Sequence, residues 1–416
     1  MAFNKHPPLQ VYQTIRFLSS LFFSIVVTVN LVYQATVVGL TPLQLVLVGT
    51  LLETITFLFE VPTGVIADVY SRKLSVIIGI FLIGLGFVVE GSFATFAGVL
   101  LAQVIWGIGF TFVSCAREAW IADEVGEKLA SQAFSRGAQM SLIGSIVGIA
   151  LSMFLANINI RLPIILGGLL YSCQSIYLYF YMSETNFHPT PVIKRETFGV
   201  MKEALISGLK IIKSSPVLPA TIAASLIYGL FSEGFDRLWT PFIIQNFVFP
   251  SLFDLSPVVW FGIIAMVANL LSALSINFVE RQATTSTPRF AVSVLFKSNF
   301  LLIISVVVFA LSGNFYLTLV SYWLSVIFKE IRGPFFDTWL NQNLESKTRA
   351  TVFSLCSQTN AVGQIAGGPI LGLIATVVSL RLSLVLSGLI LIPLLFLYRL
   401  RSQSSTKLHP PLPITT

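Results

Sequence analysis

The chain has few charged residues, and this scarcity excludes a soluble globular protein. Of its 416 residues only 10% are Asp, Glu, Lys or Arg, whereas 55% are hydrophobic. A soluble domain carries about a quarter charged residues, which help to cover its surface with polar groups. Most of this surface is therefore expected to face lipid, and the composition predicts an integral membrane protein.

Cysteine and histidine are scarce too. The three cysteines lie in or beside apolar runs, which indicates no disulfide framework: Cys115, Cys173 and Cys356. The three histidines lie outside these runs: His6, His188 and His409. The sequence has no G-x-x-x-x-G-K-[ST] phosphate loop, and no nucleophile–base pair or metal-ligand spacing in a soluble domain. We therefore expect no enzyme, no metal site and no cofactor.

Long apolar runs are what the sequence has instead. A helix needs about 20 apolar residues to cross roughly 30 Å of hydrocarbon. Twelve runs have this length, and they cover residues 15–37, 43–67, 74–94, 97–119, 136–156, 162–182, 216–246, 257–279, 290–312, 316–338, 350–376 and 380–400. The first run lacks a small-x-small cleavage site, so we expect it to remain as a span. The predicted fold class is an all-α membrane protein with 12 transmembrane helices.

Lys and Arg gather in alternate loops between these runs. The basic side holds Arg72, Lys73, Lys128, Arg136, Lys194, Arg195, Lys202, Lys210, Lys213, Arg281, Arg289, Lys347, Arg349, Arg399, Arg401 and Lys407. The opposite loops hold only Arg161 and Arg381. By the positive-inside rule, both termini are predicted to be cytoplasmic, in a multi-pass protein of the inner or plasma membrane. The net charge of +7 is explained by this orientation and does not indicate nucleic-acid binding.

An internal repeat divides the chain. Trp120 and Trp339 are 339 − 120 = 219 residues apart. The same offset relates Phe134, Ser135, Gln139, Gly144 and Gly148 to Phe353, Ser354, Gln358, Gly363 and Gly367. Between the copies, residues 183–215 form the longest polar stretch. We therefore expect pseudo-symmetric six-helix bundles at 1–182 and 216–401, a cytoplasmic linker at 183–215 and a cytoplasmic tail at 402–416.

One loop carries a family signature. Between the second and third runs, Gly64, Asp68, Arg72 and Lys73 are spaced as in G-x-[LIV]-A-D-x-x-G-R-[KR]. This pattern resembles the loop of the major facilitator superfamily of secondary transporters, except that Ser71 replaces a glycine. Asp68 is placed at a helix C-terminus, where the helix dipole disfavours its charge, so a cationic partner is expected.

The resemblance implies two six-helix bundles that work by alternating access. It also implies that Asp68 and Arg72 help to lock the outward-facing state, while Gly64 permits close helix approach. An acidic residue at the end of the fourth span completes this cluster in the family. Asp123 is our first candidate for it and Glu118 the second. Alternatively, the two basic residues of the loop serve membrane orientation alone.

Two further stretches resemble family elements less closely. Gly107 and Gly109, after Trp106, match the fourth-span R-x-x-x-G-x-G element, but Gln103 stands where many exporters have an arginine tied to proton coupling. In the fifth span Ile149 replaces the proline of the antiporter element. Close helix packing by glycines four residues apart is the simpler interpretation of this span and of its repeat copy.

Carboxylates inside spans are costly and are candidates for function. A carboxyl in apolar surroundings takes up a proton more readily than one in water. Glu53 is the first candidate for proton coupling, with Glu60 seven residues further on the same face, and a static packing role is the alternative. In the seventh span, Glu233 and Arg237 are spaced to pair, and Asp236 lies beside them. This pairing is expected to form either a moving gate or a static bridge.

By the family resemblance, the first, fourth, seventh and tenth spans line a central cavity. Its wall would include Asn30, Gln34, Gln103, Trp106, Arg117, Tyr228, Glu233, Asp236, Tyr322 and Trp323. A wall with many aromatic residues and few charges suits an amphipathic organic compound.

These features lead to one main functional hypothesis. We expect proton-coupled efflux of a small amphipathic compound, as in the bacterial drug and metabolite efflux permeases that the sequence resembles. The partners would be this substrate, protons and the lipid bilayer, and the protein would be a monomer. The alternatives are proton symport of a polar nutrient, such as a sugar, amino acid or organic acid, and a non-transporting membrane sensor or partner of the same fold.

Overall fold

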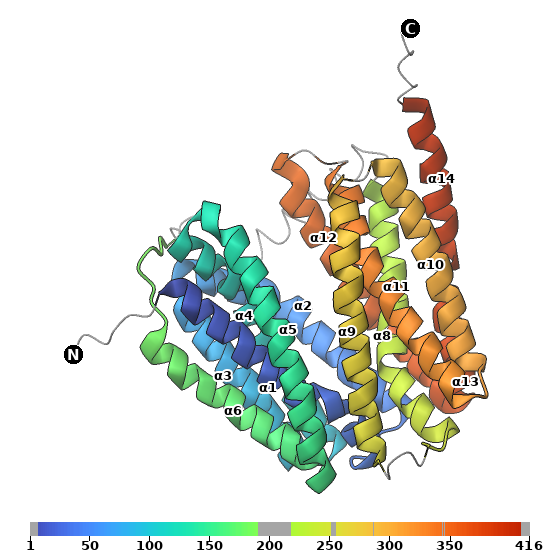
Figure 1. Ribbon diagram of the computed structural model, residues 1–416, viewed down its shortest axis with the longest axis horizontal. Coiled ribbons are helices and arrows are strands. Elements are labelled where there is room, and N and C mark those ends of the chain that lie inside the picture. The colour runs from blue at the N-terminus through green and yellow to red at the C-terminus, as the bar shows by residue number, and fades with distance from the viewer. Residues whose placement is uncertain are drawn as a thin grey trace. The chain divides into compact units, whose positions relative to one another are not determined.

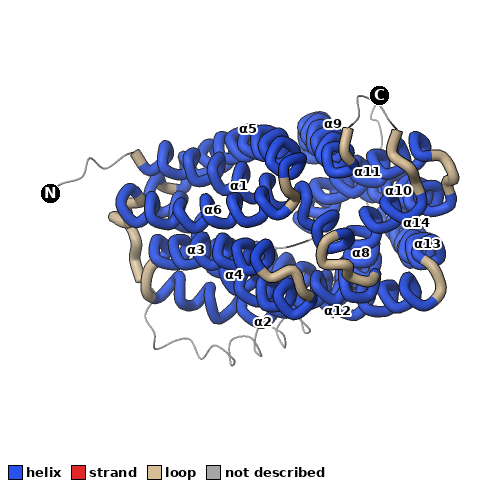
Figure 2. Tube along the Cα trace, turned by 90° about the horizontal axis from the view of Figure 1, so that it is seen from below, coloured by secondary structure: helices blue, strands red, loops and turns tan. Residues whose placement is uncertain are grey.

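The computed structural model describes residues 7–189, 218–250, 255–285, 287–342, 344 and 346–408, and all regular elements among them are α-helices (Figures 1 and 2). The first six helices are α1 (Pro8–Thr36), α2 (Pro42–Val69), α3 (Arg72–Ser92), α4 (Phe96–Val125), α5 (Glu127–Ile158) and α6 (Arg161–Tyr181). The others are α8 (Leu218–Asn246), α9 (Pro257–Thr285), α10 (Pro288–Leu311), α11 (Phe315–Asn341), α12 (Ser346–Val377), α13 (Leu380–Ile390) and α14 (Ile392–Leu408). Most of the expected linker and the last eight residues lie outside the described part.

Eleven segments of the described residues are long and apolar enough to cross a membrane. They correspond to eleven of the twelve predicted runs. The remaining run forms α11, a helix of 27 residues whose second half carries Lys329, Glu330, Arg332 and Asp337. The twelfth run is interrupted between α13 and α14 at Leu391. Pro393 explains the break, because proline removes a backbone donor and clashes with the preceding turn.

The repeat is visible in the helix boundaries. Helices α4, α5 and α6 begin at Phe96, Glu127 and Arg161, and 219 residues later α11, α12 and α13 begin at Phe315, Ser346 and Leu380. The N-caps correspond as well. Thr95 accepts a hydrogen bond from the Gly98 amide, and Asn314 accepts bonds from the Tyr316 and Leu317 amides. The duplicated sequence therefore specifies the same helix starts in both copies.

The chain forms two compact units. The first consists of residues 1–202 and 249–266, and the second of 203–248 and 267–416. Residues 257–266 at the start of α9 therefore group with the first unit, whereas the sequence analysis assigned them to the second bundle. In the first unit α1 packs on α5, and α3 packs on α4 and α6. In the second unit α8 packs on α12, and α10 packs on α11.

Glycines allow the closest helix contacts in each unit. A Cβ atom at Gly144 would lie 2.3 Å from the Phe17 carbonyl oxygen of α1, so only glycine fits there. In the second unit, a Cβ atom at Gly363 would lie 2.4 Å from the Leu226 carbonyl oxygen of α8. The repeated glycines therefore serve close packing of α5 on α1 and of α12 on α8.

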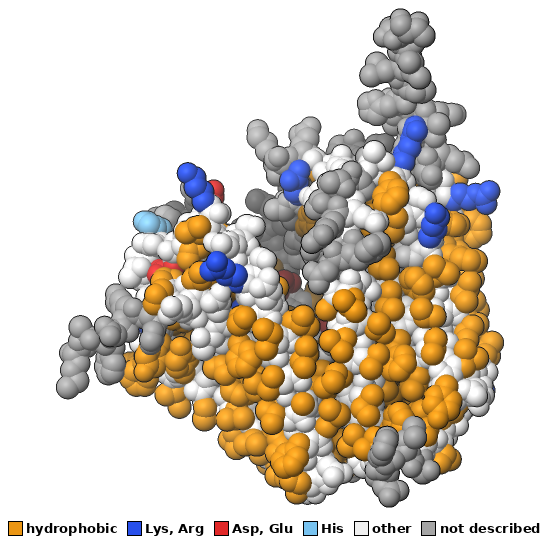
Figure 3. Space-filling view, in the orientation of Figure 1, with side chains coloured by type: hydrophobic (Ala, Val, Ile, Leu, Met, Phe, Trp, Pro, Cys, Tyr) orange, Lys and Arg blue, Asp and Glu red, His pale blue; other side chains and the backbone are white. Residues whose placement is uncertain are grey.

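The sides of the helices are apolar. Figure 3 shows hydrophobic side chains along the helices, with Lys and Arg near helix ends. Phe154 on α5 and Leu274 on α9 are each 68% exposed, which water would disfavour and hydrocarbon permits. This surface agrees with the membrane-protein class that the composition predicts.

Candidate functional site

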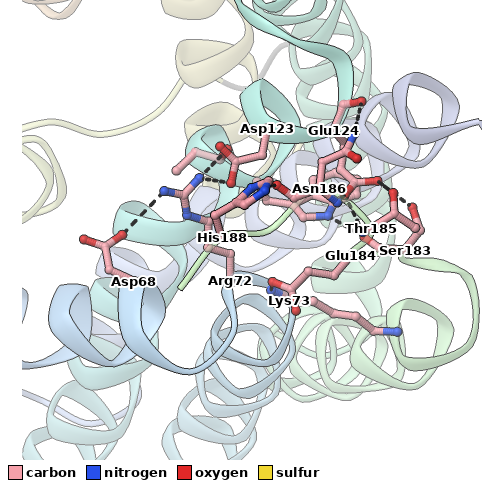
Figure 4. A network of polar contacts seen from close by, with 12 residues as sticks. Asp68, Arg72, Lys73, Asp123, Glu124, Ser183, Glu184, Thr185, Asn186 and His188 are labelled. Carbon is pink, nitrogen blue, oxygen red and sulfur yellow. Dashed lines mark hydrogen bonds and ion pairs between the residues drawn. The ribbon is translucent and has the colours of Figure 1, made fainter. Parts of the chain in front are cut away.

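Arg72 joins the ends of α2 and α4 (Figure 4). Its Nη1 atom donates hydrogen bonds to Asp123 and to the Ala119 carbonyl, the latter at 2.9 Å, and its Nη2 atom lies 3.6 Å from Asp68 Oδ1. The three charged side chains are only 20% to 32% exposed. Of the two acidic residues considered for this cluster, Asp123 contacts Arg72, whereas Glu118 pairs elsewhere. Gly64 lies half-buried in α2, one turn before Asp68.

Ser71 adopts a backbone conformation that does not require the glycine of the family pattern. Its φ angle is −173°, an extended conformation that any residue adopts. Its hydroxyl caps α3 by accepting from the Leu74 amide at 2.9 Å, and it donates to Glu184 at 2.6 Å. The serine therefore contributes a cap and a link to the segment after α6.

The residues that follow α6 extend the network, and the sequence interpretation did not include them. Glu184 also accepts from the Lys73 amide at 2.9 Å, and Lys73 Nζ donates to the Tyr179 carbonyl at 3.0 Å. Glu124 accepts from the backbone amides of Thr185 and Asn186 at 2.6 and 2.9 Å. The start of the expected linker is thus tied to the ends of α3 and α4, as Figure 4 shows.

A pocket lies among the helices of the first unit. Its volume is about 470 Å³. It is lined by Arg16, Ser19, Ser20 and Phe23 of α1, Ile83 of α3, Trp106, Phe110, Val113, Ser114, Arg117 and Glu118 of α4, Ser141 of α5 and Tyr171 of α6. Pockets of roughly 300 to 1,000 Å³ accommodate small organic ligands.

Two arginines and one carboxylate meet in this pocket. Glu118 Oε1 accepts from Arg16 Nη1 at 3.2 Å, and from Arg117 Nε and Nη2 at 3.0 and 2.8 Å. Arg16 Nε also donates to Ser141 Oγ at 2.9 Å, which fixes the guanidinium against α5. The sequence analysis did not select Arg16, although it lies within the first predicted span. The rule that charges inside spans are functional candidates would have identified it.

Aromatic rings form the apolar part of the wall. The Trp106 ring lies 6.0 Å from that of Phe23 and 5.4 Å from that of Phe87, centroid to centroid. Trp106 and Arg117, which were expected in the wall of a central cavity, line this pocket of the first unit. The described residues thus place an aromatic wall and a charged group in a single pocket.

Asn30, Gln34 and Gln103 lie elsewhere, which differs from the expected cavity wall. Gln34 and Gln103 are both 0% exposed, and Asn30 is 7% exposed. The two glutamines donate to opposite carboxylate oxygens of Glu90, at 2.6 and 3.3 Å, and the Tyr33 hydroxyl donates to the Glu90 carbonyl at 3.0 Å. These polar residues therefore connect α1, α3 and α4 inside the first unit.

Glu90 is more deeply buried than the carboxyls of α2 that the sequence analysis selected. Glu90 is fully buried, whereas Glu53 is half-buried and Glu60 is exposed at the surface of α2. Glu90 follows a long apolar run in the third predicted span, and the cost of a charge in that position was the signal that could have revealed it. A helix packed on both sides by other helices buries it completely.

The second unit contains two ion pairs near the middle of α8. Arg237 Nε lies 3.0 Å from Glu233 Oε1, and the side chains are 17% and 6% exposed. Asp236 pairs with Lys329 of α11. The first contact is the one that the four-residue spacing predicts, and the second links two helices. Pro241 lies inside α8 one turn after Arg237.

Aromatic residues of α8 and α11 surround these pairs. The Tyr322 ring stacks on that of Trp239 with centroids 4.3 Å apart, and the Arg332 guanidinium lies 3.8 Å from the Tyr228 ring centroid. Tyr322 is buried and Trp323 is half-buried. Arg332 therefore forms a cation–π contact that the sequence analysis did not predict.

Comparisons with known proteins give the family. The sequence matches the Major Facilitator Superfamily over residues 14–296. It is 26% identical over 365 residues to an uncharacterized MFS-type transporter, YxaM, of Bacillus subtilis (strain 168), and the match covers 86% of each chain.

Solved structures of transporters share the fold. A mutant of the nucleoside transporter NupG matches with a TM-score of 0.77 at 13% identity, over 94% of this chain and 99% of that one. An inward-facing bacterial homolog of the human lysosomal transporter Spinster matches with a TM-score of 0.74 at 15% identity, over 96% and 97% of the two chains. The predicted fold class is thereby confirmed. From its sequence match and its helical architecture, this chain belongs to the Major Facilitator Superfamily and is a transporter rather than an enzyme.

Proposed function

We propose that this transporter exports a small amphipathic organic compound in exchange for protons, across a cell membrane with both of its termini in the cytoplasm. The observation that carries the proposal is the pocket of about 470 Å³ in the first unit. Its volume suits a small organic molecule, and its wall combines the Trp106 and Phe23 rings with a compact charged group. Such a wall contacts the apolar and the polar part of an amphipathic molecule together.

The Arg72 cluster would set the balance between transporter conformations. Arg72 forms an ion pair with Asp68 at the end of α2 and a charge-assisted hydrogen bond with Asp123 at the end of α4. Any movement that separates these two ends must break one of the two contacts. A difference of a few kcal/mol between two conformations is enough to decide which one is populated. We propose Gly64, Asp68, Arg72, Lys73 and Asp123 as this conformational switch.

Glu53 remains the proposed proton-coupling residue. It is a half-buried carboxyl in the first half of α2, within a predicted span. A carboxyl that faces different surroundings in two conformations binds its proton in one and releases it in the other. Glu233 and Asp236, whose ion pairs would compete with protonation, are the alternative coupling sites.

The test uses the full chain reconstituted in vesicles with an imposed pH gradient. A panel of radiolabelled amphipathic compounds is offered, and accumulation is compared with gradient-free exchange. Glu53→Gln should retain exchange and lose accumulation. Glu127→Gln, which changes an exposed carboxylate at the start of α5, is the control and should transport normally. Undiminished accumulation by Glu53→Gln would remove this residue from coupling.

The direction of coupling is decided by the same vesicles. Export by exchange requires substrate and protons to move in opposite directions, whereas symport requires the same direction. The charged group in the pocket favours symport of a polar organic acid as the second candidate. Accumulation driven only by protons that enter with the substrate would establish this second function instead of export.

A further inference from the structure

The pocket of the first unit has an excess of positive charge. Arg16 and Arg117 both line it, and Glu118 is the single acidic residue among its lining residues. All three contacts from the guanidinium groups to Glu118 end on one carboxylate oxygen, Oε1. One negative charge therefore stands against two positive charges in a part of the chain that spans the membrane.

The arginines keep donor groups that the protein does not use. Arg16 uses Nε for Ser141 and Nη1 for Glu118, and Arg117 uses Nε and Nη2 for Glu118. Among the described residues, no side-chain or backbone acceptor takes a hydrogen bond from Arg16 Nη2 or Arg117 Nη1. Their side chains are 23% and 19% exposed, so the guanidinium groups reach the open pocket.

A cation in such a place is expensive unless an anion compensates it. Ionisable groups within a membrane are costly, and a buried charge is stabilised by a partner with good hydrogen-bond geometry. Arginine is suited to this role because its planar fork matches a carboxylate or a similar oxyanion. Glu118 neutralises the charge of one arginine, so a ligand with a single negative charge would neutralise the other.

The rest of the wall defines the other part of this ligand. Phe23, Trp106, Phe110 and Val113 line the pocket together with the arginines. A molecule that fills about 470 Å³ must therefore place an apolar body on these side chains while its charged group reaches the arginines.

We propose that the pocket binds monovalent amphipathic organic anions, with the carboxylate or sulfonate of the ligand between Arg16 and Arg117. Glu118 and Ser141 act as positioning residues that hold the two guanidinium groups together. This inference rests on the proposed function, because it names the substrate class of the same pocket. It makes anionic compounds, rather than neutral or cationic ones, the substrates of this transporter.

Binding is measured without a gradient on the purified full chain in nanodiscs. Three nitroaromatic anions serve as probes that quench tryptophan fluorescence: 4-nitrobenzoate, 4-nitrophenylbutyrate and 4-nitrobenzenesulfonate. 4-Nitrobenzamide and 4-nitrobenzylamine are the neutral and cationic counterparts. At least one anion should quench saturably and bind about tenfold or more tightly than the amide or the amine, which corresponds to one charge-assisted contact. Trp106→Phe should remove most of this quenching, which locates the probe.

Arginine variants provide the decisive comparison. Arg16→Gln and Arg117→Gln should each weaken binding of the anion about tenfold or more, with little effect on the amide. Arg117→Lys keeps the charge and should retain part of the affinity, which separates loss of charge from loss of fold. Arg136→Gln changes an exposed arginine on α5 outside the pocket and should bind as the unmodified protein does.

Several results would overturn the assignment. The assignment fails if the amide binds as tightly as the anion, or if the amine binds more tightly. It also fails if the folded Arg16→Gln and Arg117→Gln variants bind the anion with unchanged affinity, or if none of the three anions quenches saturably. If neutral compounds accumulate under a pH gradient while the anions do not bind, the proposed export stands and the anionic substrate class fails. If the anions bind but no gradient drives their movement, the anionic ligand class stands and the proposed export fails.

Discussion

The contact between α5 and α1 allows a quantitative prediction for Gly144→Ala. The added Cβ atom would lie 2.3 Å from the Phe17 carbonyl oxygen and 3.2 Å from the Leu21 amide nitrogen. An ordinary contact begins at 3.4 Å, so the two backbones must separate by about 3.4 − 2.3 = 1.1 Å. A backbone carbonyl cannot rotate away as a side chain does, and the strain is therefore distributed over both helices.

The cost can be estimated from overpacked protein cores. Extra methyl groups in a well-packed core cost about 1 to 3 kcal/mol. In a helix, alanine regains up to about 1 kcal/mol of intrinsic propensity over glycine, which offsets part of this cost. Because the contact at 2.3 Å is with backbone, the overpacking cost should lie in the upper part of its range, about 2 to 3 kcal/mol. Subtracting about 1 kcal/mol of helix propensity leaves an expected loss of about 1 to 2 kcal/mol in the free energy of unfolding. For a unit of about 200 residues this shifts the Tm down by about 2 to 8 °C.

The same separation should affect the pocket. Arg16 of α1 is held to Ser141 of α5 by a hydrogen bond of 2.9 Å, one turn away from Gly144. A displacement of about 1 Å would lengthen this bond beyond normal hydrogen-bond distance. Gly144→Ala is thus expected to weaken binding of a nitroaromatic anion as well as stability.

The assay is thermal unfolding in detergent, followed by tryptophan fluorescence. Gly363→Ala, the repeat copy, should reproduce the loss, because its Cβ atom would lie 2.4 Å from a backbone oxygen. Gly313→Ala is the control, since nothing lies within 4 Å of its Cβ atom. If Gly144→Ala melts at or above the temperature of the unmodified protein, the packing argument is refuted.

Three further predictions concern charges and topology. Arg72→Ala and Asp123→Asn should insert and fold but transport slowly, because the α2–α4 link is lost; normal initial rates in vesicles would contradict the proposed switch. Glu90→Gln should unfold close to the temperature of the unmodified protein, whereas Glu90→Leu should lose about 1 to 3 kcal/mol for each buried glutamine amide that it leaves without an acceptor. Equal melting of these two variants would argue against a structural role of the cluster. A reporter fused after Thr416 should be active only in the cytoplasm, and activity outside the cell would reverse the predicted orientation.

The amino-acid sequence alone determined the class of this protein and the approximate positions of its apolar spans. Apolar runs with few charges require lipid as solvent, and they predicted membrane spans that the structure contains. The 219-residue repeat carried the same caps, Thr95 and Asn314, and hence the same helix starts in both halves. Asp68 lies at the end of α2 and Arg72 begins α3 only four residues later, so the connectivity of the chain alone keeps the two side chains near each other.

Only the tertiary structure decided which face of each helix points inward. In a soluble helix the apolar stripe marks the buried face, but a membrane helix is apolar on all sides because lipid and protein interior are equally apolar. The sequence therefore could not show that Gln34 and Gln103 meet Glu90 instead of a cavity. It also could not show that Arg16 and Glu118, 102 residues apart, come within 3.2 Å in one pocket. Such contacts depend on how α1, α3, α4 and α5 pack. Close approach of glycines on one helix to backbone carbonyls of another, rather than hydrophobic periodicity, sets that packing.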